Sequence, residues 1–162
     1  KGGGGKEYVT DLIQYETIKN ELRKAAASAS VLSAGNSGKR GHVPKAVHFP
    51  KKSKHVRIKR FSYDVKGIIE RLRSGSIGDV DRKCCYVMFF VNGLGELNTA
   101  KINRHGVELI GLCDGRLSTQ DIASKFIPLE TPSENRVQEN VINAVRKLRE
   151  MNVIEEKAND LP

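Results

Sequence analysis

Apolar positions recur with a helical period near the start of the chain. The side chains that repeat at steps of three and four residues are Leu12, Tyr15, Ile18 and Leu22. This spacing predicts a helix from Thr10, which can cap it, to about Ser30. The apolar stripe is narrow, so the helix either packs on the rest of the chain or binds a partner.

The pattern changes to strand-like alternation further along. Residues 55–62 (HVRIKRFS) place Val56 and Ile58 on one face and Phe61 on the other, which is typical of an edge strand. Residues 65–72 (VKGIIERL) then predict one or two helical turns. Residues 84–91 (CCYVMFFV) form the longest apolar run and have the β-branched and aromatic content of a buried strand.

A hairpin is predicted to follow this strand. Asn92-Gly93 and Leu94-Gly95 supply turn chemistry, and residues 96–102 return as the partner strand. The side chains of the partner strand alternate between two faces. One face has Leu97, Thr99 and Lys101, and the other has Asn98, Ala100 and Ile102.

Three helices are predicted after the hairpin. Asn103 can cap the first, which Asp114-Gly115 ends, and Ser118 with Asp121 forms a capping box for the second. Thr131-Pro132-Ser133-Glu134 is a strong start signal for the third. Asn152 is suited to a left-handed C-cap, after which residues 153–155 form a short extension.

This order predicts an α+β fold of winged-helix type. An antiparallel hairpin or three-stranded sheet precedes three helices, and an N-terminal helix and a basic linker precede the sheet. The expected organisation is a flexible start and helix over 1–33, a linker over 34–54, the winged-helix domain over 55–156 and a tail over 157–162. The linker is inferred from three glycines, two prolines and six Lys/Arg with no acidic residue in 34–54.

Charge is distributed unevenly along the 162 residues, whose net charge is +9. Residues 1–60 hold 14 Lys/Arg and 4 Asp/Glu, whereas residues 87–162 hold 9 Lys/Arg and 11 Asp/Glu. The basic third could be a solvated arm, or it could bind phosphate-rich or acidic partners. No stretch has the length and apolarity of a membrane helix or a secretory signal, so no membrane association is expected.

The residues suggest no catalytic constellation. The sequence has no P-loop, GxSxG or HExxH motif, and Gly93 and Gly95 fit a hairpin turn better than a nucleotide loop. Cys84, Cys85 and Cys113 have neither CxxC spacing nor an even count, which favours reduced thiols in the cytoplasm over a zinc site or a disulfide framework. We therefore expect a protein that is not an enzyme and needs no cofactor or metal.

Sequence-specific DNA reading is disfavoured. Residues 118–151 superficially resemble a helix-turn-helix, but the third helix would present Pro132, Ser133 and Glu134 to the groove, and a phosphate surface would repel the acidic residue. Nucleic-acid binding through the basic N-terminal arm remains the alternative function.

A peptide-binding surface is the preferred interpretation. The last strand of a sheet offers unpaired main-chain groups to an extended peptide. The third helix could form the other wall, although its polar side chains could equally be plain surface residues. The candidate peptide-binding residues are Glu96, Leu97, Asn98, Thr99, Ala100, Lys101, Ile102, Arg136, Asn140, Asn143 and Lys147.

The stretch ELNTAKINRHGVELIGLCDGRLSTQDIASKF (96–126), with a long capped helix ending in REMNVIEE, resembles the PqqD-like proteins. These are peptide chaperones, or precursor-recognition domains, of pathways for ribosomally made, modified peptides. The matching motifs are Ile102-Asn103, Leu112-Cys113-Asp114-Gly115 and Ser118 to Ala123, and the resemblance covers roughly residues 84–156.

The resemblance implies a winged fold of three strands and three helices. It also implies that a leader peptide docks against the third strand and third helix, here Glu96 to Ile102 and Arg136 to Lys147. The expected partners are a precursor peptide and a maturation enzyme, often of the radical S-adenosylmethionine type. Residues 10–30 could then bind a partner or cover the groove in cis.

Overall fold

The computed structural model describes residues 7–32, 49–76, 78, 80–126 and 134–157. The predicted α+β class is confirmed. The helices are α1 (Glu7–Leu32), α2 (Val65–Arg73), α3 (Arg104–Leu112), α4 (Thr119–Lys125) and α5 (Glu134–Glu150). The strands are β1 (Phe49–Lys52), β2 (Arg57–Phe61), β3 (Cys85–Val91), β4 (Leu97–Ile102) and β5 (Ile154–Lys157).

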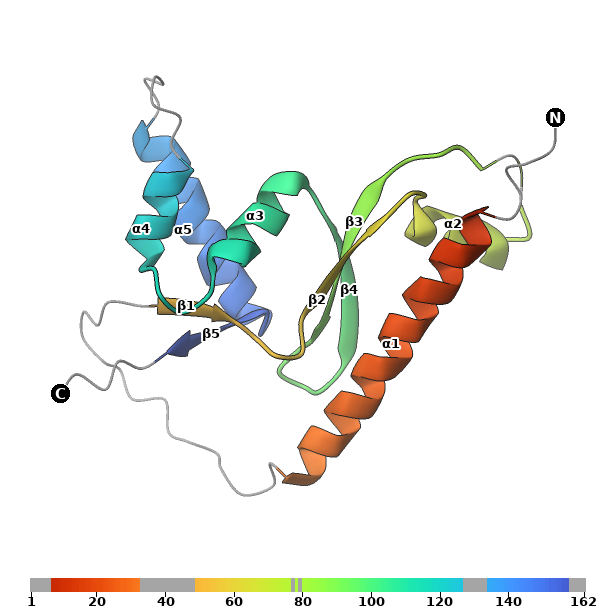
Figure 1. Cartoon of the computed structure of the whole chain (residues 1–162), viewed down its shortest axis with the longest axis horizontal. Helices are drawn as coiled ribbons and strands as arrows, with labels where there is room; N and C mark the ends of the chain where they lie inside the picture. Colours follow the sequence, from red (N-terminus) through yellow and green to blue (C-terminus); the bar gives the residue numbers. More distant parts are fainter. Residues whose placement is uncertain (1–6, 33–48, 77, 79, 127–133, 158–162) are drawn as a thin grey trace.

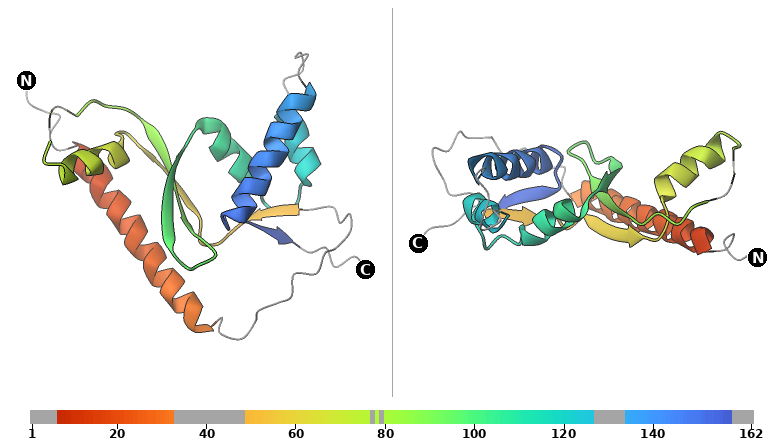
Figure 2. Two further views of the ribbon diagram at one scale, coloured as in Figure 1. Left: turned by 180° about the vertical axis from the view of Figure 1, so that it is seen from behind. Right: turned by 90° about the horizontal axis from the view of Figure 1, so that it is seen from above.

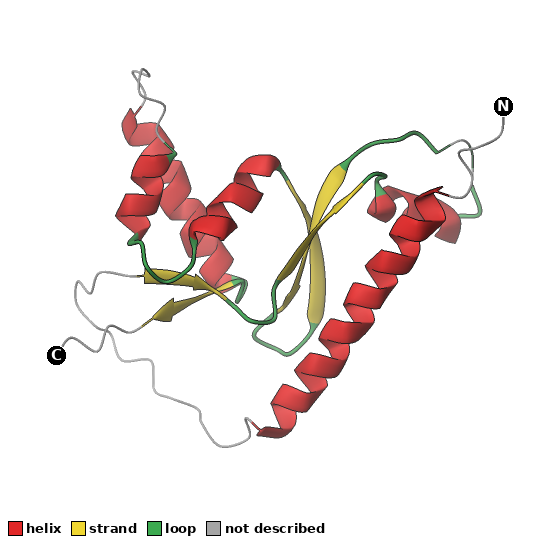
Figure 3. Ribbon diagram, viewed as in Figure 1, coloured by secondary structure: helices red, strands yellow, loops and turns green. Residues whose placement is uncertain are grey.

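The strands form two antiparallel sheets (Figure 3). The larger has the order β2-β3-β4, with Arg57 opposite Phe89 and Phe89 opposite Thr99. The smaller joins β1 to β5, with Lys51 opposite Glu155. As predicted, β2 is an edge strand, and β4 forms the other edge of the larger sheet.

The central strand β3 is covered on both faces. Val87 and Phe89 belong to an apolar cluster that also contains Tyr15 and Leu22 of α1. The intervening Met88 and Phe90 belong to a second cluster, shared with α3, α4, α5 and β5. The sheet thus lies between α1 on one side and the helices α3–α5 on the other (Figures 1 and 2). This two-sided burial explains why residues 84–91 read as a continuous apolar run.

Helix α1 packs on the chain itself. Tyr15 is 5% exposed, and its ring lies 5.2 Å from that of Phe89, centroid to centroid. The Asp11 carboxylate accepts hydrogen bonds from the backbone amides of Ser62 and Tyr63 at 2.7 and 3.0 Å. The helix therefore covers a sheet face and anchors the turn between β2 and α2.

The local start and stop signals of the C-terminal helices are confirmed. The Asn103 side chain caps α3, and Ser118 and Asp121 form the reciprocal capping box of α4. Asn152 adopts a left-handed conformation with φ of 58° after α5. The predicted start signal at Thr131-Pro132 lies outside the described residues.

The linker assigned to residues 34–54 was wrong at its C-terminal end, because Phe49–Lys52 form β1. The amide of Lys52 donates to the Cys113 carbonyl at 2.6 Å, and that of Gly115 donates to the Pro50 carbonyl at 2.9 Å. Strand β1 is therefore bonded on one side to β5 and on the other to the turn between α3 and α4. The folded unit starts before residue 55, and it includes α1 through the apolar cluster beneath that helix.

The C-terminal extension is also more structured than expected. Residues 154–157 form β5, so Lys157 belongs to a strand and not to the predicted tail over 157–162. Val153 and Ile154 are buried, and the Arg149 guanidinium pairs with the Glu156 carboxylate. The small sheet therefore joins β1, which precedes the larger sheet in the chain, to β5, which follows the C-terminal helices.

Candidate functional site

The turn between β3 and β4 determines which main-chain groups of β4 point out of the sheet. The Asn92 amide donates to the Glu96 carbonyl at 2.9 Å, and the Gly95 amide donates to the Asn92 carbonyl at 3.0 Å. Gly95 has φ of 79°, as the left-handed position of this three-residue loop requires. The pair Asn92–Glu96 is therefore a hydrogen-bonded pair of the ladder.

Hydrogen-bonded and non-bonded pairs alternate in an antiparallel ladder. Counting from the turn, the amides and carbonyls of Asn98, Ala100 and Ile102 face β3. Those of Leu97, Thr99 and Lys101 face outward, away from the sheet. We call these three residues the outer edge of β4. Within the described residues, no strand pairs with this edge.

One side chain already contacts the outer edge. The Lys66 ammonium of α2 donates to the Thr99 carbonyl at 3.2 Å, which agrees with an outward direction for this carbonyl. The Tyr15 hydroxyl of α1 lies 3.3 Å from the Thr99 hydroxyl. Thr99 is thus held from both helices, although its outward amide has no strand partner in the described part of the chain.

An ion pair holds Lys101, the next residue of the outer edge of β4. The Lys101 ammonium lies 2.5 Å from the Asp64 carboxylate, which also accepts a hydrogen bond from the Gly67 amide at 3.1 Å. Partial burial opposes ionisation of Asp64, but the Lys101 and Gly67 hydrogen bonds outweigh it and hold the pKa of Asp64 below its usual value. The Asp64 carboxylate therefore stays ionised at neutral pH, and its contact with Lys101 ties the start of α2 to β4.

The β4 side chains line two different surfaces, as the alternation predicted. Leu97 packs on the cluster beneath α1, whereas Ala100 and Ile102 pack on the cluster beneath the C-terminal helices. Glu96 precedes the strand, and its carboxylate accepts a hydrogen bond from the Asn92 side-chain amide at 3.0 Å. Glu96 therefore belongs to the turn, not to the strand.

The predicted residues of the third helix lie on its solvent-facing side. Arg136, Asn140, Asn143 and Lys147 are all exposed on α5. Helix α5 packs closely on α4 and β5, whereas β4 packs on β3, α1 and α3. The two predicted walls of the peptide-binding surface, β4 and α5, therefore do not pack closely on each other. They are connected through a common core, to which Ala100 and Val141 both contribute.

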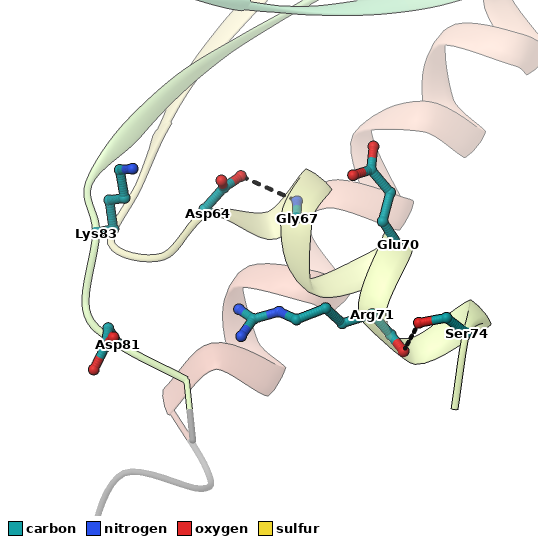
Figure 4. Close-up of a pocket in the computed structure, with 7 residues that line it drawn as sticks. All are labelled: Asp64, Gly67, Glu70, Arg71, Ser74, Asp81 and Lys83. Carbon is teal, nitrogen blue, oxygen red and sulfur yellow. Dashed lines mark hydrogen bonds between the residues drawn. The ribbon is translucent and has the colours of Figure 1, made fainter. Parts of the chain in front are cut away.

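A hollow that was not predicted from the sequence lies beside α2 (Figure 4). It has a volume of about 490 Å³ and is lined by Asp64, Gly67, Glu70, Arg71, Ser74, Asp81 and Lys83. The Asp64 carboxylate and the Ser74 hydroxyl are bonded to groups of α2 itself. The lining offers charged groups of both signs but no nucleophile paired with a base, so it gives no basis for a catalytic site.

Two of the three thiols are buried or half-buried. Burial raises the pKa of Cys113 to about 11, and burial likewise raises the pKa of Cys85. Cys84 is exposed, and all three cysteines are free. The residues that the structure describes contain no group of three or more His, Cys, Asp or Glu placed to hold a metal ion.

No known family model and no curated protein matches this chain. Among the described helices, none combines the length and the apolar character needed to span a bilayer.

Proposed function

We propose that this protein is a non-catalytic peptide-binding protein that captures an extended peptide along the outer edge of β4. The peptide would add to the sheet as a strand beside β4. By its resemblance to the PqqD-like proteins, the peptide is the leader of a ribosomally made precursor, and the complex presents it to a maturation enzyme. In this proposal β2-β3-β4 and α3–α5 are the strands and helices of a winged-helix domain.

The observation that carries the proposal is that no strand among the described residues pairs with the outer edge of β4. Leu97, Thr99 and Lys101 each direct one amide and one carbonyl outward, which is the pattern that an added strand requires. Each main-chain hydrogen bond contributes only about 0.5–1.5 kcal/mol net. Affinity therefore also needs side-chain contacts, which the half-buried Leu97, Ala100 and Ile102 can supply.

Strands β1 and β2 are poorer candidates for strand addition. Strand β1 already has bonded neighbours on both sides. Strand β2 has a free edge but carries Arg57, Lys59 and Arg60, and charged side chains of this kind discourage edge pairing. The chain therefore favours β4 as the edge that accepts a peptide.

Thr99→Pro tests the proposal at the edge itself. Proline removes the outward amide of residue 99, which makes no bond within the sheet, and proline is tolerated at such edge positions. The probes are leader segments of short precursor peptides encoded beside the gene for this protein, titrated by isothermal calorimetry. We expect Thr99→Pro to weaken binding at least tenfold while the far-ultraviolet circular dichroism stays native.

Two control variants make the result specific. Thr99→Val keeps the amide and removes only the hydroxyl that faces Tyr15, so it should bind with nearly native affinity. Asn98→Pro removes an amide that faces β3, so it should disrupt the sheet. Unchanged affinity in a folded Thr99→Pro variant would rule out strand addition at β4.

A further inference from the structure

A second surface of the molecule carries a concentration of positive charge. We define the basic strip as six exposed residues of β1, β2 and the segment between them, namely Lys51, Lys52, Lys54, Arg57, Lys59 and Arg60. No acidic residue occurs between Glu21 and Asp64 in the sequence. The strip runs from β1 through a turn at Lys54 into β2 (Figure 1), and its β2 part lies on the far side of β3 from β4.

Most of this charge is not neutralised within the described residues. Lys52, Lys54 and Lys59 form no ion pair there, and the Arg57 guanidinium donates to the carbonyls of Lys54 and Val56 instead of a carboxylate. Lys51 pairs through its backbone, lying opposite Glu155 in the β1–β5 ladder and forming a backbone β-bridge with Asp114. Elsewhere on the described surface Lys101, Arg104 and Arg149 are ion-paired, but these residues are not consecutive in the chain as those of the strip nearly are.

Protection of a free sheet edge does not account for the whole strip. Charged side chains on β2 would be enough to discourage edge pairing there. Lys52 belongs to β1, whose two sides are already bonded, and Lys54 lies in the connection to β2. These lysines repel their basic neighbours without protecting an edge, which points to an anionic partner.

We propose that the basic strip binds the phosphate backbone of double-stranded nucleic acid without reading its sequence. Of the apolar residues beside the strip, Val56, Ile58 and Phe61 pack into the two cores and Pro50 is buried, so only the half-buried Phe49 could contact a peptide or a membrane. The strip also has no exposed aromatic ring on which single-stranded bases could stack. Recognition therefore depends on charge alone.

Charge density favours a duplex over an acidic peptide. Duplex DNA carries one negative charge per ~1.7 Å of its axis, whereas an extended acidic peptide carries at most one per ~3.3 Å. Binding to the denser polyanion releases more condensed counterions. This activity goes beyond peptide capture and uses the edge of the sheet opposite to the outer edge of β4.

The test measures binding of the full chain to a fluorescent 20-base-pair duplex as a function of salt, by anisotropy. The strip variant is Lys52→Gln, Lys54→Gln, Lys59→Gln. The control variant, Lys24→Gln, Arg73→Gln, Lys125→Gln, removes three exposed charges outside the strip. Each phosphate contact contributes about 0.9 to the slope of log K against log salt concentration. We expect the strip variant to lose between two and three from this slope and to bind at least tenfold more weakly at low salt.

The outcomes separate the possible partners. The control variant should keep the native slope, because its three residues lie off the strip. Equal losses in both variants would show only a general charge effect and overturn the proposal. Binding to polyglutamate or to vesicles of phosphatidylserine as tight as binding to the duplex would also overturn it, in favour of an acidic peptide or a lipid surface.

Discussion

Lys66 is the residue that most directly controls access to the outer edge of β4. Its ammonium occupies the Thr99 carbonyl, which is one of the acceptors that an incoming strand needs. A peptide amide must therefore replace the Lys66 ammonium, or approach the second lone pair of the same carbonyl. In the free protein this hydrogen bond satisfies the Thr99 carbonyl, which reduces the tendency of β4 to pair nonspecifically with strands of other molecules.

Removing this contact should strengthen peptide binding. Lys66→Met keeps most of the side-chain length but cannot donate a hydrogen bond, so the peptide no longer competes with it. Because a partly exposed bond of this kind stabilises by about 0.5–1 kcal/mol, we expect leader peptides to bind two- to fivefold more tightly in calorimetric titrations. Lys83→Met, a nearby exposed lysine, is the matched control and should leave the affinity unchanged. Weaker binding by Lys66→Met would instead identify Lys66 as a direct peptide contact.

At the scale of elements, α1 is an integral cover of the sheet. It buries Tyr15 and Leu22 against Phe61 and Phe89. It covers a face of the sheet and leaves the outward groups of β4 without a strand partner in the described residues. Of the roles considered for residues 10–30, packing on the rest of the chain is therefore the one that the contacts support.

The contribution of α1 to stability can be measured with two substitutions on the same helix. Tyr15 is 5% exposed and Ile13 is 62% exposed. We expect Tyr15→Ala to lower the free energy of unfolding by about 3–5 kcal/mol, as large aromatic deletions in cores do. Ile13→Ala should change it by less than about 0.5 kcal/mol. Urea unfolding followed by circular dichroism checks both values, and equally small changes would mean that α1 does not dock on the sheet.

Elements specified by local signals could be predicted from the sequence, whereas those that depend on distant partners could not. The capping groups Asn103 and Ser118 act within their own helices, and the turn at Asn92 to Gly95 fixes the hairpin. Strand β1 contains Pro50 and follows a Gly- and Lys-rich stretch, so nothing local marks it as a strand. Its partner β5 lies about a hundred residues later, and only the folded chain brings the two together.

The candidate site could be predicted only in part for the same reason. Alternation along residues 97–102 gave the two faces of β4 correctly, because side-chain direction follows from the strand period. The contact of Lys66 with Thr99 joins residues 33 positions apart and leaves no periodic signal. The basic strip was assigned partly to a linker because charge composition alone does not distinguish a solvated arm from a charged ribbon of a sheet.

At the scale of the whole molecule, one three-stranded sheet has two covered faces and two unlike edges. The helix α1 and the helices α3–α5 bury the faces. The β4 edge offers outward main-chain groups beside half-buried apolar side chains, and the β2 edge is lined by cations. Under the two proposals a peptide strand would pair with β4 and an anionic partner would bind along β2, so the two partners would not compete for the same edge.

The most direct test of the central claim is amide hydrogen exchange along β4, measured by nuclear magnetic resonance with and without a leader peptide. In the free protein the amides of Asn98, Ala100 and Ile102 should exchange slowly, and those of Leu97, Thr99 and Lys101 should exchange rapidly. Peptide binding should slow the second set, because each of these amides then gains a partner in the added strand. Slow exchange of the second set in the free protein, or unchanged rapid exchange in the saturated complex, would contradict the claim that β4 offers a free edge to a peptide.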